Sequence, residues 1–433
     1  MNNLRHLQSL TPGLSAGVAT VTLALAIVFV LAVVASQAAQ AQTFKVLHTF
    51  TGGDGKNPSA AVTIEAGDLY GTTFAGGEAG YGTVYQMKRI GAGWTFNSLH
   101  SFSKSDGAIP TAPVVFGPDG ALYSTSEFGG NGNGNVFKLK PSPLCRLHNY
   151  NRHMPPCSWS ESVLYTFEGG SDGSQPIGLV FDQEGNIYGT TSSGGAYGEG
   201  TVYELTSSGS GWTESLLHSF QPNDVDGFIP YRSVMVFDTA GNLYGTTYYG
   251  GAHNAGTVFQ LTPSGSGWTE NILYNFRNEE DGSFPYSGLI IDQSGNLYGT
   301  TTDAGTGGGG TVFELSPSGG GWTFSVLYSL TGSSGEQGGP AWALVMDAEG
   351  NLYDTTQSDG ANNLGSVFKL TKTGGSWTYT SLHDFTGGSD GWFPISGVTL
   401  DANGNLYGTT YYGGDLNCGK NGSGCGVVWK ITP

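Results

Sequence analysis

Basic side chains are scarce in this chain of 433 residues. Sixteen Lys and Arg stand against thirty-four Asp and Glu, which gives a net charge of −18 at pH 7. An excess of negative charge repels phosphate backbones and anionic lipid headgroups, so we expect no nucleic-acid partner and, once the leader is removed, no membrane partner. Solubility accounts for an acidic surface more simply than an acidic functional patch does.

Helical periodicity is missing after residue 41, and long apolar runs are limited to the N-terminus. An apolar stretch from about Ala16 to Ala35 follows Arg5 and precedes Ala39-Gln-Ala41, which has the small-x-small form of a signal-peptidase site. We expect residues 1–41 to be a signal peptide and the protein to be secreted, periplasmic or at the cell surface. An uncleaved anchor is the alternative, because the stretch approaches membrane-spanning length.

Cysteines are few, and all four lie in two loops. In an exported protein, disulfides are the first expectation, with the local pairs Cys145–Cys157 and Cys418–Cys425. His148 and His153 lie between the first two cysteines, and the four residues together have a spacing that could also hold zinc. Disulfide and zinc therefore both stay open for that loop, and the disulfide is favoured.

One phrase, Gly-Asn-Leu-Tyr-Gly-Thr-Thr at 241–247, is repeated with small changes along the chain. Its tyrosine occurs at Tyr70, Tyr123, Tyr188, Tyr244, Tyr298, Tyr353 and Tyr407. The successive gaps are 53, 65, 56, 54, 55 and 54 residues. A period of about 54 residues is typical of propellers and repeat arrays. We therefore predict one domain over 42–433, with seven units and one insertion at 141–158 in the second unit.

Each unit contains four short apolar runs in a fixed order. Examples are Pro285–Asp292, then a Leu-Tyr-Gly-Thr-Thr run, then 256–262 and 268–276. The third run alternates apolar and polar residues as a half-buried strand requires. The link Asp-x-x-Gly-Asn, as at 238–242, suits a tight hairpin with glycine at positive φ, so we interpret its aspartates as turn formers.

Four-stranded units repeated seven times predict an all-β fold, a seven-bladed β-propeller of antiparallel blades. The ends of the chain favour a closed ring. Residues 43–50 form a fourth strand with no unit before it, and 426–432 form a third strand with no unit after it. We expect the N-terminal strand to complete the last blade.

The repeat resembles the GloVer (Gloeobacter/Verrucomicrobia) tandem-repeat family of exported bacterial proteins. The resemblance rests on Asp281-Gly282, Pro285, Gly295-Asn-Leu-Tyr-Gly-Thr-Thr301 and Gly310-Thr-Val-Phe313, which recur in register over essentially all of 43–433. It implies a surface or extracellular repeat protein, without an established activity. Ser124 and Asp354 replace the glycine of the Tyr-Gly-Thr motif, so the repeat is imperfect.

In this strand order, the Asp-Gly turns and the loops after the second strands emerge on one face. The turn aspartates are Asp54, Asp106, Asp172, Asp226, Asp281 and Asp390. The aromatic residues on this face are Phe128, Phe228, Tyr248, Tyr249, Phe284, Trp392, Tyr411 and Tyr412. Rings and carboxylates together can bind sugars, or carboxylates can hold calcium. Residues repeated at one position usually serve the fold, so Trp392 and the two tyrosine pairs are stronger candidates than Asp226, Asp281 or Asp390.

Four histidines occupy one position of the fourth strand. They are His48, His100, His218 and His383, and the other units have Tyr165, Tyr274 and Tyr328 there. Exchange with tyrosine speaks against metal ligation, so we expect half-exposed strand residues and no metal. No cofactor is expected, since calcium has no further residue pattern to support it.

No catalytic motif stands out in the sequence. The glycine-rich segment 305–310 joins two strands rather than a strand and a helix, which excludes a nucleotide loop. We therefore expect a monomeric, exported propeller that binds a surface ligand, carbohydrate in the first place, and is not an enzyme. A glycoside hydrolase or lyase with carboxylates at the central channel, and a structural or adhesive surface protein, stay open as alternatives.

Overall fold

The computed structural model describes most of the chain from residue 42 onward. The described ranges are 42–142, 158–209, 211–223, 225–265, 267–332, 339–340 and 342–433. The predicted signal peptide at 1–41 and the predicted pair Cys145–Cys157, with its zinc alternative, lie outside them. Among the described residues, no helix is long and apolar enough to cross a membrane.

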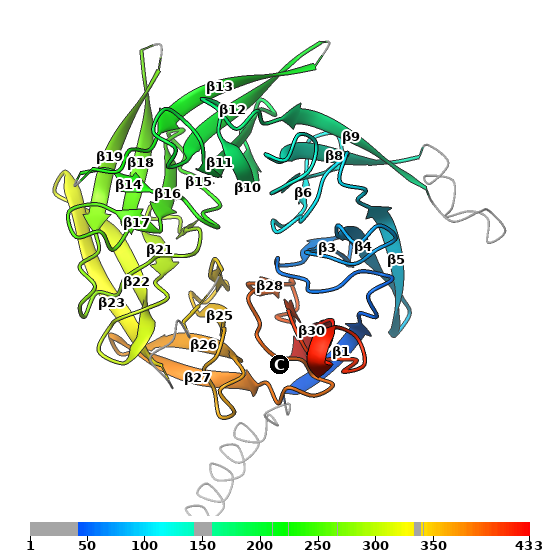
Figure 1. Ribbon diagram of the computed structural model, residues 1–433. Coiled ribbons are helices and arrows are strands. Elements are labelled where there is room, and N and C mark those ends of the chain that lie inside the picture. Colours follow the sequence, from blue (N-terminus) through cyan, green and yellow to red (C-terminus); the bar gives the residue numbers. More distant parts are fainter. Residues whose placement is uncertain are drawn as a thin grey trace, which may run out of the picture. The chain divides into compact units, whose positions relative to one another are not determined.

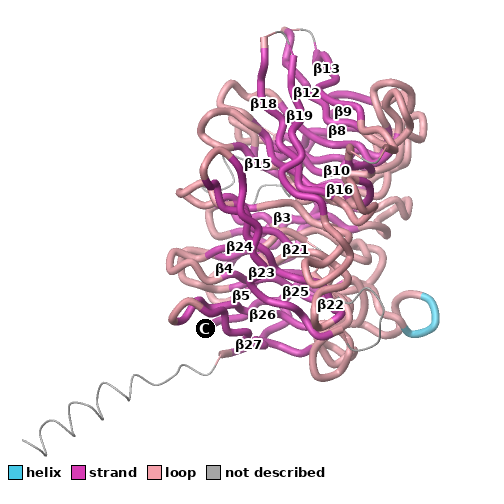
Figure 2. Tube along the Cα trace, turned by 90° about the vertical axis from the view of Figure 1, so that its left-hand side faces the viewer, coloured by secondary structure: helices cyan, strands magenta, loops and turns pink. Residues whose placement is uncertain are grey.

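Seven four-stranded antiparallel sheets form a ring within the compact unit Phe44–Thr432 (Figure 1). In each sheet the first strand lies nearest the middle of the ring and the fourth lies outside. Seen from the side, the strands run between two faces formed by loops (Figure 2). The predicted seven-bladed β-propeller is thus confirmed.

The first four blades follow one another along the chain. Blade one consists of β2 (Thr63–Glu65), β3 (Asp68–Thr73), β4 (Thr83–Ile90) and β5 (Gly93–Ser101). Blade two consists of β6 (Val115–Phe116), β7 (Leu122–Ser126), β8 (Asn135–Pro141) and β9 (Trp159–Thr166). Blade three consists of β10 (Ser174–Phe181), β11 (Ile187–Ser193), β12 (Thr201–Ser208) and β13 (Gly211–Ser219). Blade four consists of β15 (Val236–Phe237), β16 (Leu243–Thr247), β18 (Thr257–Ser264) and β19 (Gly267–Asn275).

The remaining blades bring the chain back to its start. Blade five consists of β20 (Ile290–Ile291), β21 (Leu297–Thr300), β22 (Gly308–Ser318) and β23 (Gly321–Thr331). Blade six consists of β24 (Val345–Met346), β25 (Leu352–Thr356), β26 (Ser366–Thr373) and β27 (Ser376–Asp384). Blade seven consists of β28 (Thr399–Leu400), β29 (Leu406–Thr410), β30 (Val427–Thr432) and β1 (Thr43–Thr49). A small ribbon pairs β14 (Gly227–Phe228) with β17 (Tyr249–Gly250), and one 3-10 turn, η2, spans Lys420–Gly422.

The N-terminal strand closes the ring. β1 lies beside β30 in the order β1-β30-β29-β28, as the sequence predicts. Beyond the strand, the N–H of Phe50 donates to the carbonyl of Gly426 at 3.1 Å. Blade seven is therefore built from both ends of the propeller.

The repeated phrase proves to be framework. In blade four, the hydroxyl of Tyr244 donates to Asp238 at 2.9 Å, and the N–H of Asn242 donates to the same carboxylate at 2.9 Å. Gly241 has φ of 84°, as the hairpin requires. A Cβ on Gly245 would lie 2.6 Å from the buried ring of Phe259, so only glycine fits there. Each part of the phrase thus forms the hairpin or packs the blade.

The core lies between adjacent blades and is rich in aromatic rings. Ring pairs such as Phe220 with Phe259, 5.3 Å apart, join the residue after one fourth strand to the third strand of the next blade. The departures Ser124 and Asp354 are fully buried within their strands. Each blade therefore depends on both of its neighbours for burial.

We predict that Phe50→Ala destabilises the ring. Phe50 is fully buried where the chain leaves β1, and its ring lies 5.3 Å from Tyr85 of blade one. Loss of a buried phenyl ring should lower the free energy of unfolding by about 3–5 kcal/mol. Denaturant unfolding followed by tryptophan fluorescence measures this change. Ile90→Ala, at a side chain 60% exposed, serves as the control and should change little; equal midpoints for the two variants would contradict the closure role.

Candidate functional site

Two sets of loops pair with each other on one side of the ring, which we call the Asp-Gly face. The turn leading into a blade bridges to the loop after that blade's second strand, as in Ala108 with Phe128, Phe228 with Tyr249, and Trp392 with Tyr412. The structure therefore brings the predicted aspartates and aromatic residues to one face. The η2 turn, cyan in Figure 2, belongs to a loop on this face.

Each of the six turn aspartates accepts a hydrogen bond from a backbone N–H group of its own turn. Asp226 accepts the N–H of Gln221 at 3.1 Å, and an equivalent backbone N–H reaches each of the other five. Asp226 and Asp281 are only 4% and 8% exposed. This geometry agrees with their interpretation as turn formers and leaves little of the candidates Asp226, Asp281 and Asp390 accessible for a ligand.

A side chain from the preceding fourth strand also contacts each turn aspartate. The pairs, at 2.9–3.2 Å, are His48–Asp54, His100–Asp106, Tyr165–Asp172, His218–Asp226, Tyr274–Asp281 and His383–Asp390. We expected half-exposed histidines, whereas their side chains are 17–19% exposed and make this defined contact. Histidine and tyrosine exchange because either can bond the same carboxylate.

The rings at this position of the fourth strand, now including Tyr328, pack against the fourth strand of the next blade. At four interfaces the partner is a stacked aromatic ring, 3.7–5.2 Å away between centroids. The stacked pairs are His48–Phe96, Tyr274–Phe324, Tyr328–Tyr379 and His383–Phe44. At the three interfaces between blades one and four, the equivalent residues are Glu161, Glu214 and Glu270. A carboxyl group therefore replaces an aromatic ring at three successive interfaces.

Burial is the main cause of the raised pKa values of Glu161 and Glu214. Burial raises the pKa of Glu161 to about 7, and the nearby charge of Asp106 adds to the shift. Burial likewise raises the pKa of Glu214 to about 7, with a contribution from Asp172. Oε1 of each glutamate accepts no hydrogen bond from the described residues. Near neutral pH, both carboxyl groups are thus close to their protonation midpoint.

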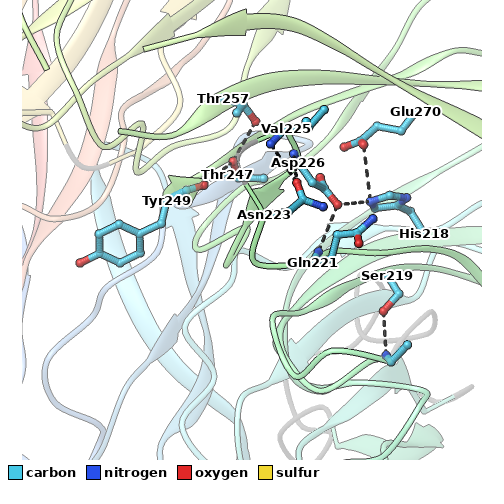
Figure 3. A network of polar contacts seen from close by, with 11 residues as sticks. His218, Ser219, Gln221, Asn223, Val225, Asp226, Thr247, Tyr249, Thr257 and Glu270 are labelled. Carbon is cyan, nitrogen blue, oxygen red and sulfur yellow. Dashed lines mark hydrogen bonds and ion pairs between the residues drawn. The ribbon is translucent and has the colours of Figure 1, made fainter. Parts of the chain in front are cut away.

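The third glutamate, Glu270, lies against a histidine (Figure 3). His218 Nε2 is 3.2 Å from Asp226 Oδ2 and 3.6 Å from Glu270 Oε2. Burial raises the pKa of Glu270. Burial alone would lower the pKa of His218, but the hydrogen bond to Asp226 and the charges of Glu270 and Asp226 raise it. Of the described residues, these three form the one group of metal-type donors within 4.8 Å of one another.

A cleft of about 550 Å³ lies on the Asp-Gly face at blade seven. Its walls are Lys56, Asn57, Trp392, Tyr411, Tyr412 and residues 419–424, a set that we call the blade-seven cleft. The Trp392 and Tyr412 rings are stacked 4.5 Å apart, and Asn57 Nδ2 donates to the carbonyl of Tyr411 at 2.8 Å. A disulfide between Cys418 and Cys425 confirms the predicted pairing and braces the loop that forms one wall.

The aromatic candidates outside the cleft lie mainly around blade four. Tyr248 contacts Tyr249, Phe284 and Tyr286, while Phe228 stacks on Tyr249 at 5.8 Å. Tyr248 is 9% exposed, so its ring serves chiefly as packing. Phe128 lies at blade two, away from both groups in the chain, and pairs through its backbone with Ala108. The structure thus brings Trp392, Tyr411 and Tyr412 together and keeps the other candidates apart from them.

Arg232 is a candidate site residue that the sequence analysis does not identify. It belongs to the turn before β15 of blade four, and its Nη1 donates to carbonyls at the entrances of blades seven and one, Ile395 at 3.0 Å and Ser59 at 3.4 Å. Its guanidinium lies over the rings of Tyr286 at 5.4 Å and Trp342 at 5.2 Å. The side chain therefore reaches across the middle of the ring and is 6% exposed.

Arg232 influences the ionisation of groups around the axis. Burial raises the pKa of Glu127, although a hydrogen bond from Thr111 and the charge of Arg232 oppose the rise. Burial and the neighbouring Tyr412 raise the pKa of Tyr411 to about 12; the charge of Arg232 opposes this rise, and the charge of Glu127 adds to it. We call Thr111, Glu127, Tyr231, Arg232, Tyr286 and Trp342 the axial cluster. It contains one carboxylate.

A spacing difference could have revealed Arg232. In five units, the residue at the hairpin aspartate position follows the proline by seven positions, as Asp292 follows Pro285. In the fourth unit, Asp238 follows Pro230 by eight positions. Ser233 and Ser396 both accept an N–H from the second strand of their blade, which leaves Arg232 as the extra residue. Its φ of 54° is consistent with an inserted residue that bends the chain. A one-residue insertion thus directs this side chain to the axis.

We predict that Glu161→Gln changes the pH dependence of stability. The pKa of Glu161 is about 7 when folded, against an ordinary value of 4.5. Its favourable contribution is therefore fully present below pH 4.5 and is lost as the pH rises to about 7. Glutamine cannot ionise, so the variant should gain stability relative to wild type across this range. Urea midpoints measured from pH 4.5 to 8 test it; parallel curves would contradict it.

We predict that Arg232→Ala destabilises the propeller by roughly 2–4 kcal/mol, because the carbonyls of Ser59 and Ile395 lose a charged donor and two rings lose their cation. Chemical denaturation measures the effect. Arg277→Ala, at an exposed position, is the control and should change stability by less than about 0.5 kcal/mol. Equal losses of stability in the two variants would contradict a stabilising role for Arg232 at the axis.

Comparison with known proteins identifies the family to which the chain belongs. A model of the Gloeobacter/Verrucomicrobia repeat matches residues 33–155, 152–337 and 269–433. No curated protein matches the chain. A solved protein of unknown function from Dyadobacter fermentans is 13% identical, with 90% of this chain and 99% of that chain covered and a TM-score of 0.45.

An ulvan lyase of a polysaccharide lyase family is 11% identical, with 86% of this chain and 90% of that chain covered and a TM-score of 0.49. The three matched segments carry the repeat from the first blade to the last, and the chain belongs to the Gloeobacter/Verrucomicrobia repeat family.

Proposed function

We propose that this protein is exported and binds carbohydrate in the blade-seven cleft. The observation that carries the proposal is the stacked pair Trp392 and Tyr412 in the wall of a 550 Å³ cleft. Both rings are partly exposed, and a backbone bridge between their two loops fixes them. Aromatic rings held in this way offer flat apolar faces to the C–H groups of a sugar ring.

Polar groups in the same cleft supply the second part of carbohydrate recognition. Residues 419–422 of the loop are exposed and present backbone groups and Asn421, and Tyr411 and Tyr412 carry hydroxyl groups near the rings. Ligand sites commonly combine an apolar wall with a few fixed polar groups. The disulfide at the base of the loop restricts the wall before a ligand arrives, which lowers the entropic cost of binding.

The charge of the cleft favours an acidic sugar. Lys56 and Lys420 both line it, although the chain has only sixteen basic residues and a net charge of −18. A uronate or sulfate group would find positive charge here and negative charge over much of the remaining surface. Uronate-containing or sulfated polysaccharides are therefore the preferred class.

The catalytic alternative has less support. Glycoside hydrolysis usually needs two carboxyl groups facing each other, whereas the axial cluster has Glu127 alone. Glu127 is 8% exposed and accepts a hydrogen bond from Thr111 at 2.8 Å. Its position next to Arg232 is explained by packing at the axis. We therefore place binding ahead of hydrolysis, lyase chemistry or adhesion.

We predict that Trp392→Ala and Tyr412→Ala each weaken glycan binding by roughly tenfold or more, which corresponds to about 1.4 kcal/mol. A glycan array identifies a ligand for the wild type, and isothermal titration then measures the affinities. Lys56→Ala should weaken binding of an acidic glycan more than that of its neutral counterpart, and added salt should reduce the difference.

Phe228→Ala is the matched control, since Phe228 pairs with Tyr249 at the position where Trp392 pairs with Tyr412. It should leave the affinity unchanged. An array without signal for the wild type, or binding that survives both cleft substitutions, would refute the proposal. Release of reducing sugar or unsaturated uronate by the wild type would instead support the catalytic alternative.

A further inference from the structure

The group His218, Asp226 and Glu270 joins two blades at the outside of the ring. His218 belongs to β13 of blade three, Asp226 to the turn that follows, and Glu270 to β19 of blade four. Figure 3 shows the carboxyl groups of Asp226 and Glu270 directed at the imidazole from two different elements. One donor atom from each residue lies within 4.8 Å of the other two.

The spacing of the donors fits a tetrahedral metal ion. Zinc binds imidazole nitrogen and carboxylate oxygen at about 2.0–2.1 Å, so two tetrahedral ligands lie roughly 3.3–3.5 Å apart. The observed distances from His218 Nε2 are 3.2 Å to Asp226 Oδ2 and 3.6 Å to Glu270 Oε2. We propose that His218, Asp226 and Glu270 bind a divalent transition-metal ion of the zinc type across the interface of blades three and four.

Unpartnered carboxylate oxygens provide an independent reason for a cation. Asp226 is 4% exposed, yet its Oδ1 accepts no hydrogen bond from the described residues. Oε1 of Glu270 is also buried without such a partner, as it is in Glu161 and Glu214, so Asp226 Oδ1 is the oxygen that distinguishes this interface. Buried carboxylates without donors are costly, and metal coordination is one of the few ways to offset the cost. A neutral imidazole and two carboxylates carry two negative charges, which a divalent ion balances.

The donor types select the class of metal. Imidazole suits zinc and other first-row transition ions, while calcium and magnesium prefer sites made entirely of oxygen. Three protein ligands leave a fourth position for water or another group, as in zinc sites that are not purely structural. Zinc therefore fits better than calcium.

The turn holds Asp226 in place before any ion arrives. Gln221 N–H donates to Asp226 Oδ2 at 3.1 Å, and Asn223 Oδ1 accepts the N–H groups of Val225 and Asp226 at 2.9 and 2.7 Å. Such outer hydrogen bonds orient metal ligands.

Other interfaces of the same ring serve as internal comparisons. His100, Asp106 and Glu161 occupy the equivalent positions between blades one and two, but their donors do not meet the same spacing among the described residues. Tyr165 replaces the histidine between blades two and three. Among the described residues, the repeat therefore brings a complete donor set within this spacing at one interface of the three that carry glutamate.

Natural variation within the repeat supplies substitutions that suit the fold. His218→Tyr installs the residue found at Tyr165 and Tyr274, which also bonds the turn aspartate. Glu270→Phe installs the ring found at Phe96 and Phe324, which stacks on a ring in the fourth strand of the preceding blade. His100→Tyr is the matched control at an interface that has the same three residue types but not the same donor spacing.

The test is titration of the full chain with Zn²⁺ after chelation. Residues 143–157 also contain two cysteines and two histidines, so the result is the difference between wild type and each variant. Wild type and His100→Tyr should bind one more ion than His218→Tyr or Glu270→Phe, or bind it at least tenfold more tightly. Cobalt(II) should give tetrahedral visible absorption that His218→Tyr abolishes.

Thermal unfolding provides a second readout, since an ion that binds only the folded state raises the melting temperature. Zn²⁺ should raise it more in wild type than in either site variant. Equal stoichiometry, affinity and melting shift in wild type and both variants would overturn the proposal. Binding of Ca²⁺ in preference to Zn²⁺ at this group would overturn the assigned class of metal. Neither result depends on whether the blade-seven cleft binds a glycan.

Discussion

Pairing of β1 with β30 joins the two ends of the propeller, and the rest of the architecture depends on it. A blade buries its faces only against its neighbours, so an open ring would expose an apolar face at each end. The segment that completes blade seven continues to Phe50, whose ring packs against Tyr85 of blade one. One short stretch therefore holds the first and last interfaces together. Closure fixes all seven interfaces at once, which allows single interfaces to depart from the repeat.

Repetition separates framework from candidate site in this protein. The tyrosine and glycine of the repeated phrase and the turn aspartates are each accounted for by a local contact that recurs from blade to blade. Trp392, Arg232 and Glu270 have no counterparts of the same kind in most other blades. These residues lie in three different places: a cleft on one face, the axis and the outer rim. A ring of similar blades can thus carry several local specialisations without a change of fold.

The fold could be predicted because its signals are local and repeated. Strand runs, hairpin turns and the unpaired end strands each occur within a few tens of residues, and seven copies reinforce one another. The grouping of Trp392 with Tyr412 was also predictable, since strand order places their loops on one face. The reach of Arg232 to Ser59 and Ile395 was not, because it joins blades more than 160 residues apart in the chain. The contact of Glu270 with His218 was not predictable either, because the repeat does not show which side chain of the next blade faces a given histidine.

Glutamate at three successive interfaces has an energetic consequence that aromatic rings at the other four avoid. A buried carboxylate loses hydration, and the turn aspartate beside it adds a negative charge, so its ionised form is disfavoured. At Glu161 and Glu214 the raised pKa shows that protonation near neutral pH offsets much of this cost. At Glu270 an imidazole faces the same carboxyl group, and a cation can offset the cost instead. The three interfaces therefore share one electrostatic problem. Both Glu161 and Glu270 follow a blade that carries a histidine, so the spacing of the donor atoms, rather than the type of ring, decides which solution each interface can adopt.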